Sequence, residues 1–384
     1  MFIHSFEGTR DGITMAFNLA LKSKTAEASF SINRDALTTF LNAANRIVPR
    51  KTTVPILRCI HFYFKDNDGF IEATDTDLFV RLSLKGVHGN GVIDIAVNST
   101  ALTSLLEKSP RSCGTLLVER EGTSLSFKDG IVTCGKLAGV NGSDCPSNRL
   151  DVGKDVPVAL TGYDLKFIDK YIAPLCITDT QYTALDSVLF EMNGANHGFA
   201  ATDRHALVFT DYIDNANVRR AMKPKAIKAM SSLENGGTLF LGATAFEFNT
   251  GIYSVSGRCT GGAYPDFHKL VVRDGFDHEK KVDVKVLRED LNRLIIELGK
   301  TPKGHCPVFI TYSGDTVRAV RIPSDYNEHP YGTLGGIKMD ALKLSVLLER
   351  FDDNSQVMFK SVDNQSFPTQ WIDSRATTLF MPMS

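Results

Sequence analysis

Two short stretches share one pattern: "EATDTDLFVR" at residues 72–81 and "AATDRHALVF" at residues 200–209. In each, Ala-Thr-Asp is followed by two polar residues and then a hydrophobic run. The two Asp residues, Asp75 and Asp203, lie 128 positions apart. Asp203 beside His205 could be half of a catalytic site. The repetition favours another interpretation, a turn that the fold uses twice.

A longer pattern recurs around these turns. A short alternating strand, a turn containing Asp and an amphipathic helix are predicted at 28–48, 158–172 and 282–299. In the first and third of these segments, apolar residues recur at helical i, i+3, i+4 spacing. A second helix is predicted at 98–109, 223–235 and 338–351. The signals for the start of this second helix are Ser99 as a capping residue, Pro224 in the first turn, and Asp340.

These repeats predict an α+β protein of three similar domains, each with two helices packed on antiparallel sheets. Segments with many strand and turn signals follow each second helix. We expect an N-terminal extension at 1–27, loosely held, and domains at 28–152, 153–276 and 277–384, with boundaries in polar, turn-rich segments.

Composition narrows the class of protein. Of 384 residues, 43% are apolar and 23% are charged, with a net charge of −1. The N-terminus does not have the pattern of a secretory signal, and no run of about 18 apolar residues predicts a membrane span. Seven cysteines without a C-x-x-C spacing suggest free thiols in a reducing cytosol. The chain is therefore expected to be cytoplasmic.

Charge is segregated by structural element. Six predicted helix windows together hold 18 Lys and Arg against 10 Asp and Glu, a net +8, which leaves −9 for the rest of the chain. If the exposed helix faces point the same way, they form one basic surface for a polyanion held through its phosphates. The alternative is that Lys-rich helix faces serve solubility.

Catalytic and metal sites are weakly supported. No G-x-S-x-G motif supplies a nucleophile, and no G-x-x-x-x-G-K-[ST] loop predicts ATP binding. A metal site would use His197, Asp203 and His205, but nothing completes its ligand shell. Asp75 and Asp77 occupy the matching turn without a His. We therefore expect no enzyme activity and no cofactor, and Thr and Asp side chains that hydrogen-bond the backbone.

Several motifs, in order, resemble the bacterial sliding clamp family, the β subunit of DNA polymerase III. They are "RKTTVPIL" (50–57), "ATDTDL" (73–78), "LDSVLFE" (185–191), "ATDRHAL" (201–207), "YPDF" (264–267) and "MPMS" (381–384). The resemblance covers residues 29–384. It implies a closed ring, formed by a head-to-tail homodimer, in which helices line the hole and sheets lie outside.

That resemblance implies a protein that encircles duplex DNA without sequence preference and confers processivity. It tethers the DNA polymerase III α subunit, a separate clamp loader and other proteins that carry a clamp-binding motif. The alternative is a clamp-like protein scaffold with altered or lost DNA loading. In the family, the two copies meet near residues 131–137 and 295–298.

The resemblance and the charge pattern together give the candidates for DNA-facing residues. Arg50 and Lys51 lie in a loop that the family places near DNA. The remaining candidates are helix residues: Arg34, Arg46, Lys223, Lys225, Lys228, Arg293 and Lys343. For each of these, an ordinary solvated surface charge is the alternative.

The family also binds short peptides of its partners in a hydrophobic pocket between the second and third domains. Carried over by motif, that pocket comprises Leu185, Thr202, Arg204, His205, Leu207, Pro265, Leu270, Met381, Pro382 and Met383. Methionines suit a site with several partners because their side chains repack. For Leu185 and Leu207, a place in the plain hydrophobic core is the alternative.

Three positions depart from the family pattern. Arg204 stands where Gly is common, Ala206 stands where Arg is common, and the chain stops at Ser384 where the family has a basic residue. Arg204 cannot adopt a positive φ as cheaply as Gly. We therefore expect the pocket to persist with an altered peptide preference.

Overall fold

The computed structural model describes residues 27–383 except 148–149, 151, 153–156, 178–182, 195, 234, 330–333 and 365–366. Apart from Glu27, the expected N-terminal extension lies outside the described residues. The chain divides into two compact units, Met1–Leu165 with Lys225–Arg258, and Lys166–Pro224 with Cys259–Ser384. Both units take residues from the middle third of the chain, so the division into three domains stays a prediction.

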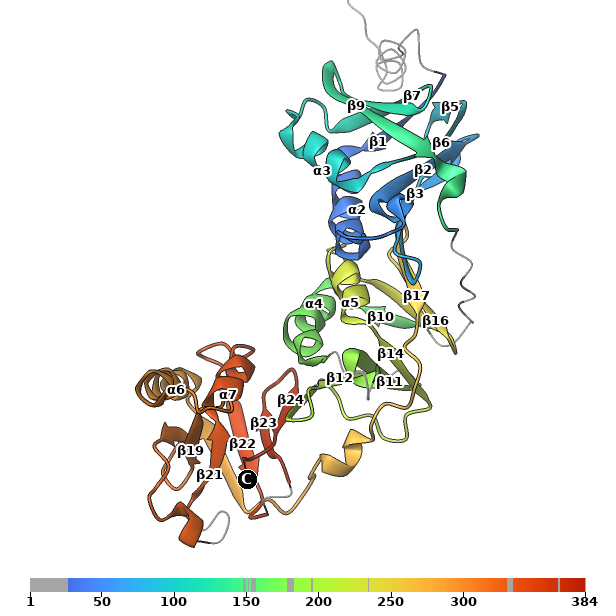
Figure 1. Ribbon diagram of the computed structural model, residues 1–384. Coiled ribbons are helices and arrows are strands. Elements are labelled where there is room, and N and C mark those ends of the chain that lie inside the picture. The colour runs from blue at the N-terminus through green and yellow to red at the C-terminus, as the bar shows by residue number, and fades with distance from the viewer. Residues whose placement is uncertain are drawn as a thin grey trace, which may run out of the picture. The chain divides into compact units, whose positions relative to one another are not determined.

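Unit 1 is built on one antiparallel sheet (Figure 1). Among the described residues it has thirteen strands, and the pairs along it are antiparallel. In spatial order these strands are β10 (Val158–Leu160), β15 (Gly237–Leu241), β16 (Ala245–Asn249), β17 (Tyr253–Arg258), β4 (Leu78–Ser83), β3 (Asp68–Thr74), β2 (Cys59–Lys65), β6 (Val92–Asn98), β9 (Val132–Asn141), β8 (Ser124–Asp129), β7 (Thr115–Glu121), β1 (Ala28–Asn33) and β5 (Gly89–Asn90).

Unit 2 contains two antiparallel sheets within the described part of the chain. The larger has the order β14 (Val218–Met222), β11 (Val188–Asn193), β12 (Asn196–Thr202), β13 (Ala206–Phe209), β24 (Thr377–Phe380), β23 (Thr369–Ile372), β22 (Val357–Ser361) and β18 (His278–Val282). The smaller has the order β20 (Arg318–Val320), β19 (Pro307–Thr311) and β21 (Gly336–Asp340).

The six predicted helices are confirmed. They are α2 (Arg34–Ile47), α3 (Ser99–Lys108), α4 (Gly162–Phe167), α5 (Pro224–Ser231), α6 (Val284–Leu298) and α7 (Ala341–Leu348). Short helical turns add η1 (Pro55–Arg58), η2 (Gly142–Asp144), η3 (Ile168–Ile172), η4 (Ala173–Leu175), η5 (Thr183–Asp186), η6 (Phe267–Leu270) and η7 (Tyr326–Glu328). The predicted apolar face of α2 packs into the core through Leu37, Phe40, Leu41, Ala44 and Ile47.

The predicted helix starts are confirmed at two of three positions. Helix α5 begins at Pro224, and Asp340 caps α7 by accepting a hydrogen bond from the backbone N–H of Leu342 at 3.2 Å. The assignment of Ser99 as a cap is wrong, because the neighbouring Asn98 has that role. Ser99 is buried and donates its hydroxyl to Asn45 Oδ1 at 2.6 Å, which ties α3 to α2.

In the repeated Thr-Asp turn, the Thr and Asp side chains hydrogen-bond the backbone of the turn, as predicted. Oδ1 of Asp75 accepts from the backbone N–H groups two and three residues later at 3.1 and 2.8 Å. Asp203 makes the same two bonds at 2.9 and 2.7 Å. The hydroxyls of Thr74 and Thr202 donate to the carbonyl four residues later, at 2.8 and 2.7 Å. A third copy of the Asp pattern, at Asp373, was not recognised in the sequence; both of its bonds measure 2.9 Å.

Each of the first two turns precedes a strand that pairs with a strand from much later in the chain. The first precedes β4, which pairs with β17 from much later in the chain through partners such as Leu78 and Gly257. The second precedes β13, which pairs with β24 at the end of the chain through Ala206 and Phe380. Each turn therefore introduces the strand that continues the sheet of one repeat into the next.

Candidate functional site

The second turn brings the end of the chain beside His205. Beyond the β13–β24 ladder, the backbone N–H of Met381 donates to the carbonyl oxygen of His205 at 2.8 Å. Two residues later, the N–H of Met383 donates to the carbonyl oxygen of Lys338 at 2.9 Å. The terminal segment is thus held between β13 and β21 by backbone hydrogen bonds.

A cavity of about 220 Å³ opens along this terminal segment. Phe380, Met381, Pro382 and Met383 give it an apolar side, and the rest of its wall is polar or charged. The lining residues are His205, His305, Asp340, Lys343, Phe380, Met381, Pro382 and Met383. Four of the ten residues predicted for a peptide pocket therefore meet at one cavity.

Lys343, which we expected among the DNA-facing residues, lies in the first turn of α7, in the wall of this cavity. Its contact with DNA stays a prediction. His305 and Asp340 are also in the wall, and their place there was not foreseen. His305 lies two residues before β19 and Asp340 is the last residue of β21, and the pairing of those strands brings them together. Asp340 was recognised only as a helix start, and no local signal in the sequence links it to the chain terminus.

Two other predicted pocket residues belong to the hydrophobic core. Leu185 and Leu207 are 2% and 4% exposed. They pack in a cluster with Tyr264, Phe267 and Leu379, among others. The core alternative therefore holds for both side chains, because neither has surface available to a ligand in this structure.

The remaining predicted pocket residues lie at the surface around that core. Thr202 uses its hydroxyl within the turn, whereas Pro265 and Leu270 are exposed. Arg204 is also exposed and has a φ of +74°, so it adopts the left-handed conformation in which a Cβ is strained. The equivalent residue of the first turn, Thr76, has a φ of +83°. The turn thus keeps its geometry without Gly.

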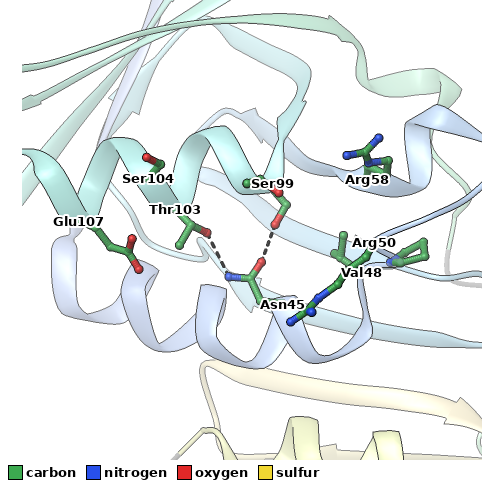
Figure 2. A pocket seen from close by; sticks show the side chains of 10 residues that line it. Asn45, Val48, Arg50, Arg58, Ser99, Thr103, Ser104 and Glu107 are labelled. Atoms are coloured by element: carbon green, nitrogen blue, oxygen red, sulfur yellow. Dashed lines mark hydrogen bonds between the residues drawn. The ribbon is translucent and has the colours of Figure 1, made fainter.

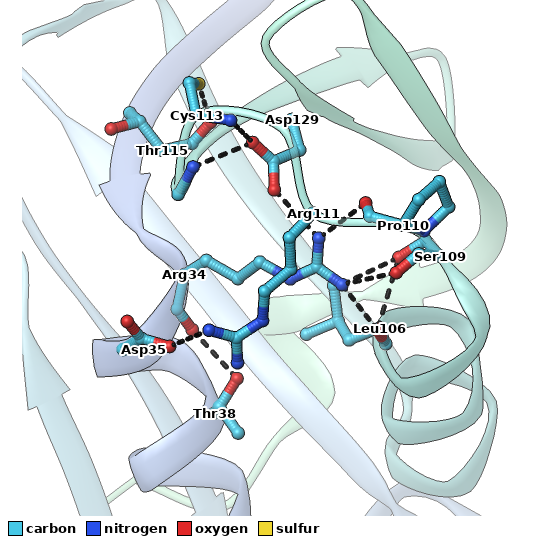
Figure 3. A network of polar contacts seen from close by, with 11 residues as sticks. Arg34, Asp35, Thr38, Leu106, Ser109, Pro110, Arg111, Cys113, Thr115 and Asp129 are labelled. Carbon is cyan, nitrogen blue, oxygen red and sulfur yellow. Dashed lines mark hydrogen bonds and ion pairs between the residues drawn. The ribbon is translucent and has the colours of Figure 1, made fainter.

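Arg34 is not a DNA-facing residue. It is 2% exposed, and its guanidinium pairs with Asp129 at 2.8 Å (Figure 3). The same group donates to backbone carbonyl oxygens of Leu106, Ser109 and Pro110 at 2.6–2.9 Å. These bonds fasten the start of α2 to the end of α3. The charge count could not distinguish such a buried brace from a surface charge.

The other basic candidates are at least partly exposed, but several are paired. Lys223 pairs with Asp186, and Lys225 pairs with Asp75 in the first Thr-Asp turn. Arg293 lies 3.4 Å from Asp290. The candidates without an ion pair among the described residues are Arg46, Arg50, Lys51, Lys228 and Lys343.

A second, polar pocket of about 490 Å³ lies between α2 and α3 in unit 1 (Figure 2). Arg50 and Arg58 lie toward one end of it, and Glu107 lies at the other. The serine and threonine side chains of α3 line the space between them. Arg58, which sequence reasoning missed, adds a positive charge next to the predicted Arg50.

The comparisons with known proteins identify the fold. Residues 28–119 match the family described as DNA polymerase III beta subunit, N-terminal domain. The β subunit of DNA polymerase III from Thermotoga maritima superposes with a TM-score of 0.77 at 16% identity, over 93% of this chain and 99% of that one. This chain has the sliding-clamp fold.

Further solved clamps show the same likeness. The DnaN sliding clamp of Pseudomonas aeruginosa, solved with griselimycin, gives a TM-score of 0.75 at 18% identity, over 93% of this chain and all of that one. The Bacillus subtilis clamp gives 0.74 at 15% identity, over 94% and 100%. No curated protein sequence matches the chain. The clamp fold therefore extends far beyond the segment that sequence similarity detects.

Proposed function

We propose that this protein is a DNA sliding clamp of the cytoplasm, a non-catalytic ring of two copies that encircles duplex DNA and tethers a replicative polymerase. The observation that carries the proposal is the clamp fold, which extends over 93% of the chain. No helix among the described residues is long and apolar enough to cross a membrane.

Exposed apolar side chains at open sheet edges support ring closure. Residues 132–138 of β9 pair with β8 and residues 139–141 pair with β6, so the second edge of residues 132–138 has no partner among the described strands. Beside this open edge, Ile131 is 92% exposed. In unit 2, β20 pairs with β19 alone among described strands, and Ile296 on α6 is 84% exposed. Pairing of these edges between copies would cover both surfaces in a head-to-tail dimer.

The basic residues support loose binding of DNA phosphates. Arg46, Arg50, Lys51 and Lys228 are exposed side chains on helices or in the loop after α2. Contacts from such residues to phosphates carry no sequence information, and they allow a protein to slide. Lys223, Lys225 and Arg293 would add to this surface less strongly, because acidic neighbours partly offset their charge.

The cavity beside Met381–Met383 supports capture of partner peptides. We propose that polymerase, loader and other partners insert a short segment here, with Thr202, Arg204, Pro265 and Leu270 at its margin. Leu185 and Leu207 would contribute from beneath, as the core that supports the site. Methionine side chains can repack around different apolar residues, which suits several partners.

Two measurements test this proposal. Sedimentation equilibrium should give a mass near twice 42.2 kDa at micromolar concentration. A strict monomer at that concentration would contradict the ring. Calorimetry with griselimycin, which the Pseudomonas aeruginosa clamp holds in its solved structure, tests the pocket. We expect saturable binding, weakened by Met381→Asp, and heat of dilution alone would contradict a clamp-like pocket.

A further inference from the structure

The cavity beside the chain terminus contains one cation with no partner. Lys343 is half-buried in the first turn of α7, and its ammonium group forms no hydrogen bond or ion pair with the described residues. An ammonium group offers three N–H donors and no acceptor. Apart from water, a ligand bound in the cavity could therefore accept hydrogen bonds from Lys343.

Asp340 is the one acidic residue in the wall, and it does not serve Lys343. Its Oδ2 is 2.8 Å from Nδ1 of His305. Its Oδ1 accepts from the backbone N–H groups of Cys306 and Leu342 at 3.1 and 3.2 Å. The side chain of Asp340 is 6% exposed and lies at the N-terminus of α7, where the helix dipole balances part of its charge.

The other ionisable groups of the wall are imidazoles. His305 is engaged with Asp340, and His205 belongs to the turn before β13. Neither can place a full negative charge beside Lys343. The oxygens of Asp340 are already engaged with His305 and with backbone N–H groups, so Lys343 is the charged group of the wall whose hydrogen bonds are left for a ligand. It shares that wall with the apolar side formed by Phe380–Met383.

We propose that Lys343 selects partner peptides in which an acidic residue follows or precedes the apolar residues that enter the cavity. This rests on the proposed peptide-binding function and adds the chemistry of the preferred segment. A carboxylate is favoured over an amide because hydrogen bonds between ionised partners are about twice as strong as neutral ones. The half-exposed position limits the preference to roughly five- to tenfold in Kd.

The test compares two acetylated peptides that each contain Leu and Phe. One has Asp next to these residues and the other has Asn, so the peptides differ only in a carboxylate against an amide. Calorimetry at low salt should show the wild-type protein binding the Asp peptide about five- to tenfold more tightly. Lys343→Gln should bring the two affinities together, and Lys343→Glu should reverse their order. Lys285→Gln is the matched control, since Lys285 is an exposed lysine in the first turn of α6.

The outcomes separate the two proposals. If the wild-type protein binds griselimycin but binds both peptides equally, the selectivity of Lys343 is overturned and the peptide pocket stands. If the preference for Asp survives in Lys343→Gln and disappears in Arg204→Gln, the selecting residue is the exposed turn arginine and the inference is wrong. Absence of binding to griselimycin and to both peptides would instead contradict the proposed function.

Discussion

Arg34, the first residue of α2, forms a buried ion pair with Asp129, the last residue of β8. Their side chains are 3% and 0% exposed. Burial alone raises the pKa of Asp129. Hydrogen bonds from Arg34 and from the backbone N–H groups of Ser112 and Cys113 outweigh it, so the pKa lies well below its ordinary value. The two charges can be buried because they pair with each other and because backbone groups supply their remaining hydrogen bonds.

Removing one partner of this pair should be costly. We expect Arg34→Met to lower the free energy of unfolding by about 3–5 kcal/mol, because the carboxylate of Asp129 is left buried without its main partner. Arg111→Met is the control from the same network, since Arg111 pairs with Asp35 where both side chains are more than half exposed. Its cost should stay below about 1 kcal/mol in urea unfolding. Equal costs would contradict the account.

The same pair predicts a pH dependence. The pKa of Asp129 is lower in the folded state than the ordinary value of 3.8, so its stabilising contribution is present above that value. It is lost as pH falls from about 5 through the folded-state pKa. Urea unfolding from pH 7 down to pH 3 should therefore show a shallower loss of stability in Arg34→Met than in the wild-type protein. Parallel curves would argue against the pair as the source.

Arg204 predicts an effect of opposite sign. Its φ of +74° strains any residue with a Cβ, whereas glycine adopts it freely. We expect Arg204→Gly to be about 1 kcal/mol more stable to urea than Arg204→Ala, the control that removes the same side chain and keeps the strain. A less stable glycine variant would mean that the turn is not strained at this position.

At the scale of elements, α6 changes character along its length. Leu287, Leu291 and Leu294 are buried, whereas Ile296 and Leu298 are 84% and 40% exposed. The apolar face predicted from its periodicity is therefore buried in the core of the chain as far as Leu294 and not at the last turn. An exposed apolar patch on a helix end is typical of a surface that another chain covers.

We therefore predict that Ile296→Glu yields folded monomers. The substitution leaves the core unchanged, so circular dichroism and urea stability should match the wild-type protein, while the mass falls from twice 42.2 kDa to 42.2 kDa. Val346→Glu is the control, an exposed apolar residue at 62% on α7. A dimer that survives Ile296→Glu as well as it survives Val346→Glu would place the interface elsewhere.

Helix periodicity and the repeated turn were visible in the sequence because both are local. The six helices and the hydrogen bonds of Asp75 and Asp203 follow from spacing and side-chain chemistry. The cap of α3 was misassigned because Asn98 and Ser99 are adjacent and both residue types cap helices. Burial of Arg34, and the meeting of His305 and Lys343 with the chain terminus, depend on long-range strand pairing that no local pattern records.

At the scale of the whole molecule, the positive charge of the helices is smaller than the count of +8 implies. Arg34, Lys223 and Lys225 each pair with an acid from another element. A weak positive surface suits a ring, because retention on DNA then depends on closure around the duplex rather than on contact strength. The central claim is therefore that the protein is held on DNA by encircling it. Such a protein leaves the DNA only where the duplex has a free end.

Retention on linear DNA with blocked ends tests that claim most directly. The protein is mixed with a duplex biotinylated at both ends, and streptavidin is then added to block the ends. The protein that stays on the DNA is measured after gel filtration at about 0.3 M salt, because phosphate contacts are weak at that concentration. A ring predicts retention with both ends blocked, loss with free ends, release after a single internal cut, and no retention of Ile296→Glu. Retention that is equal on blocked, free and cut DNA, or absent from all three, would contradict it.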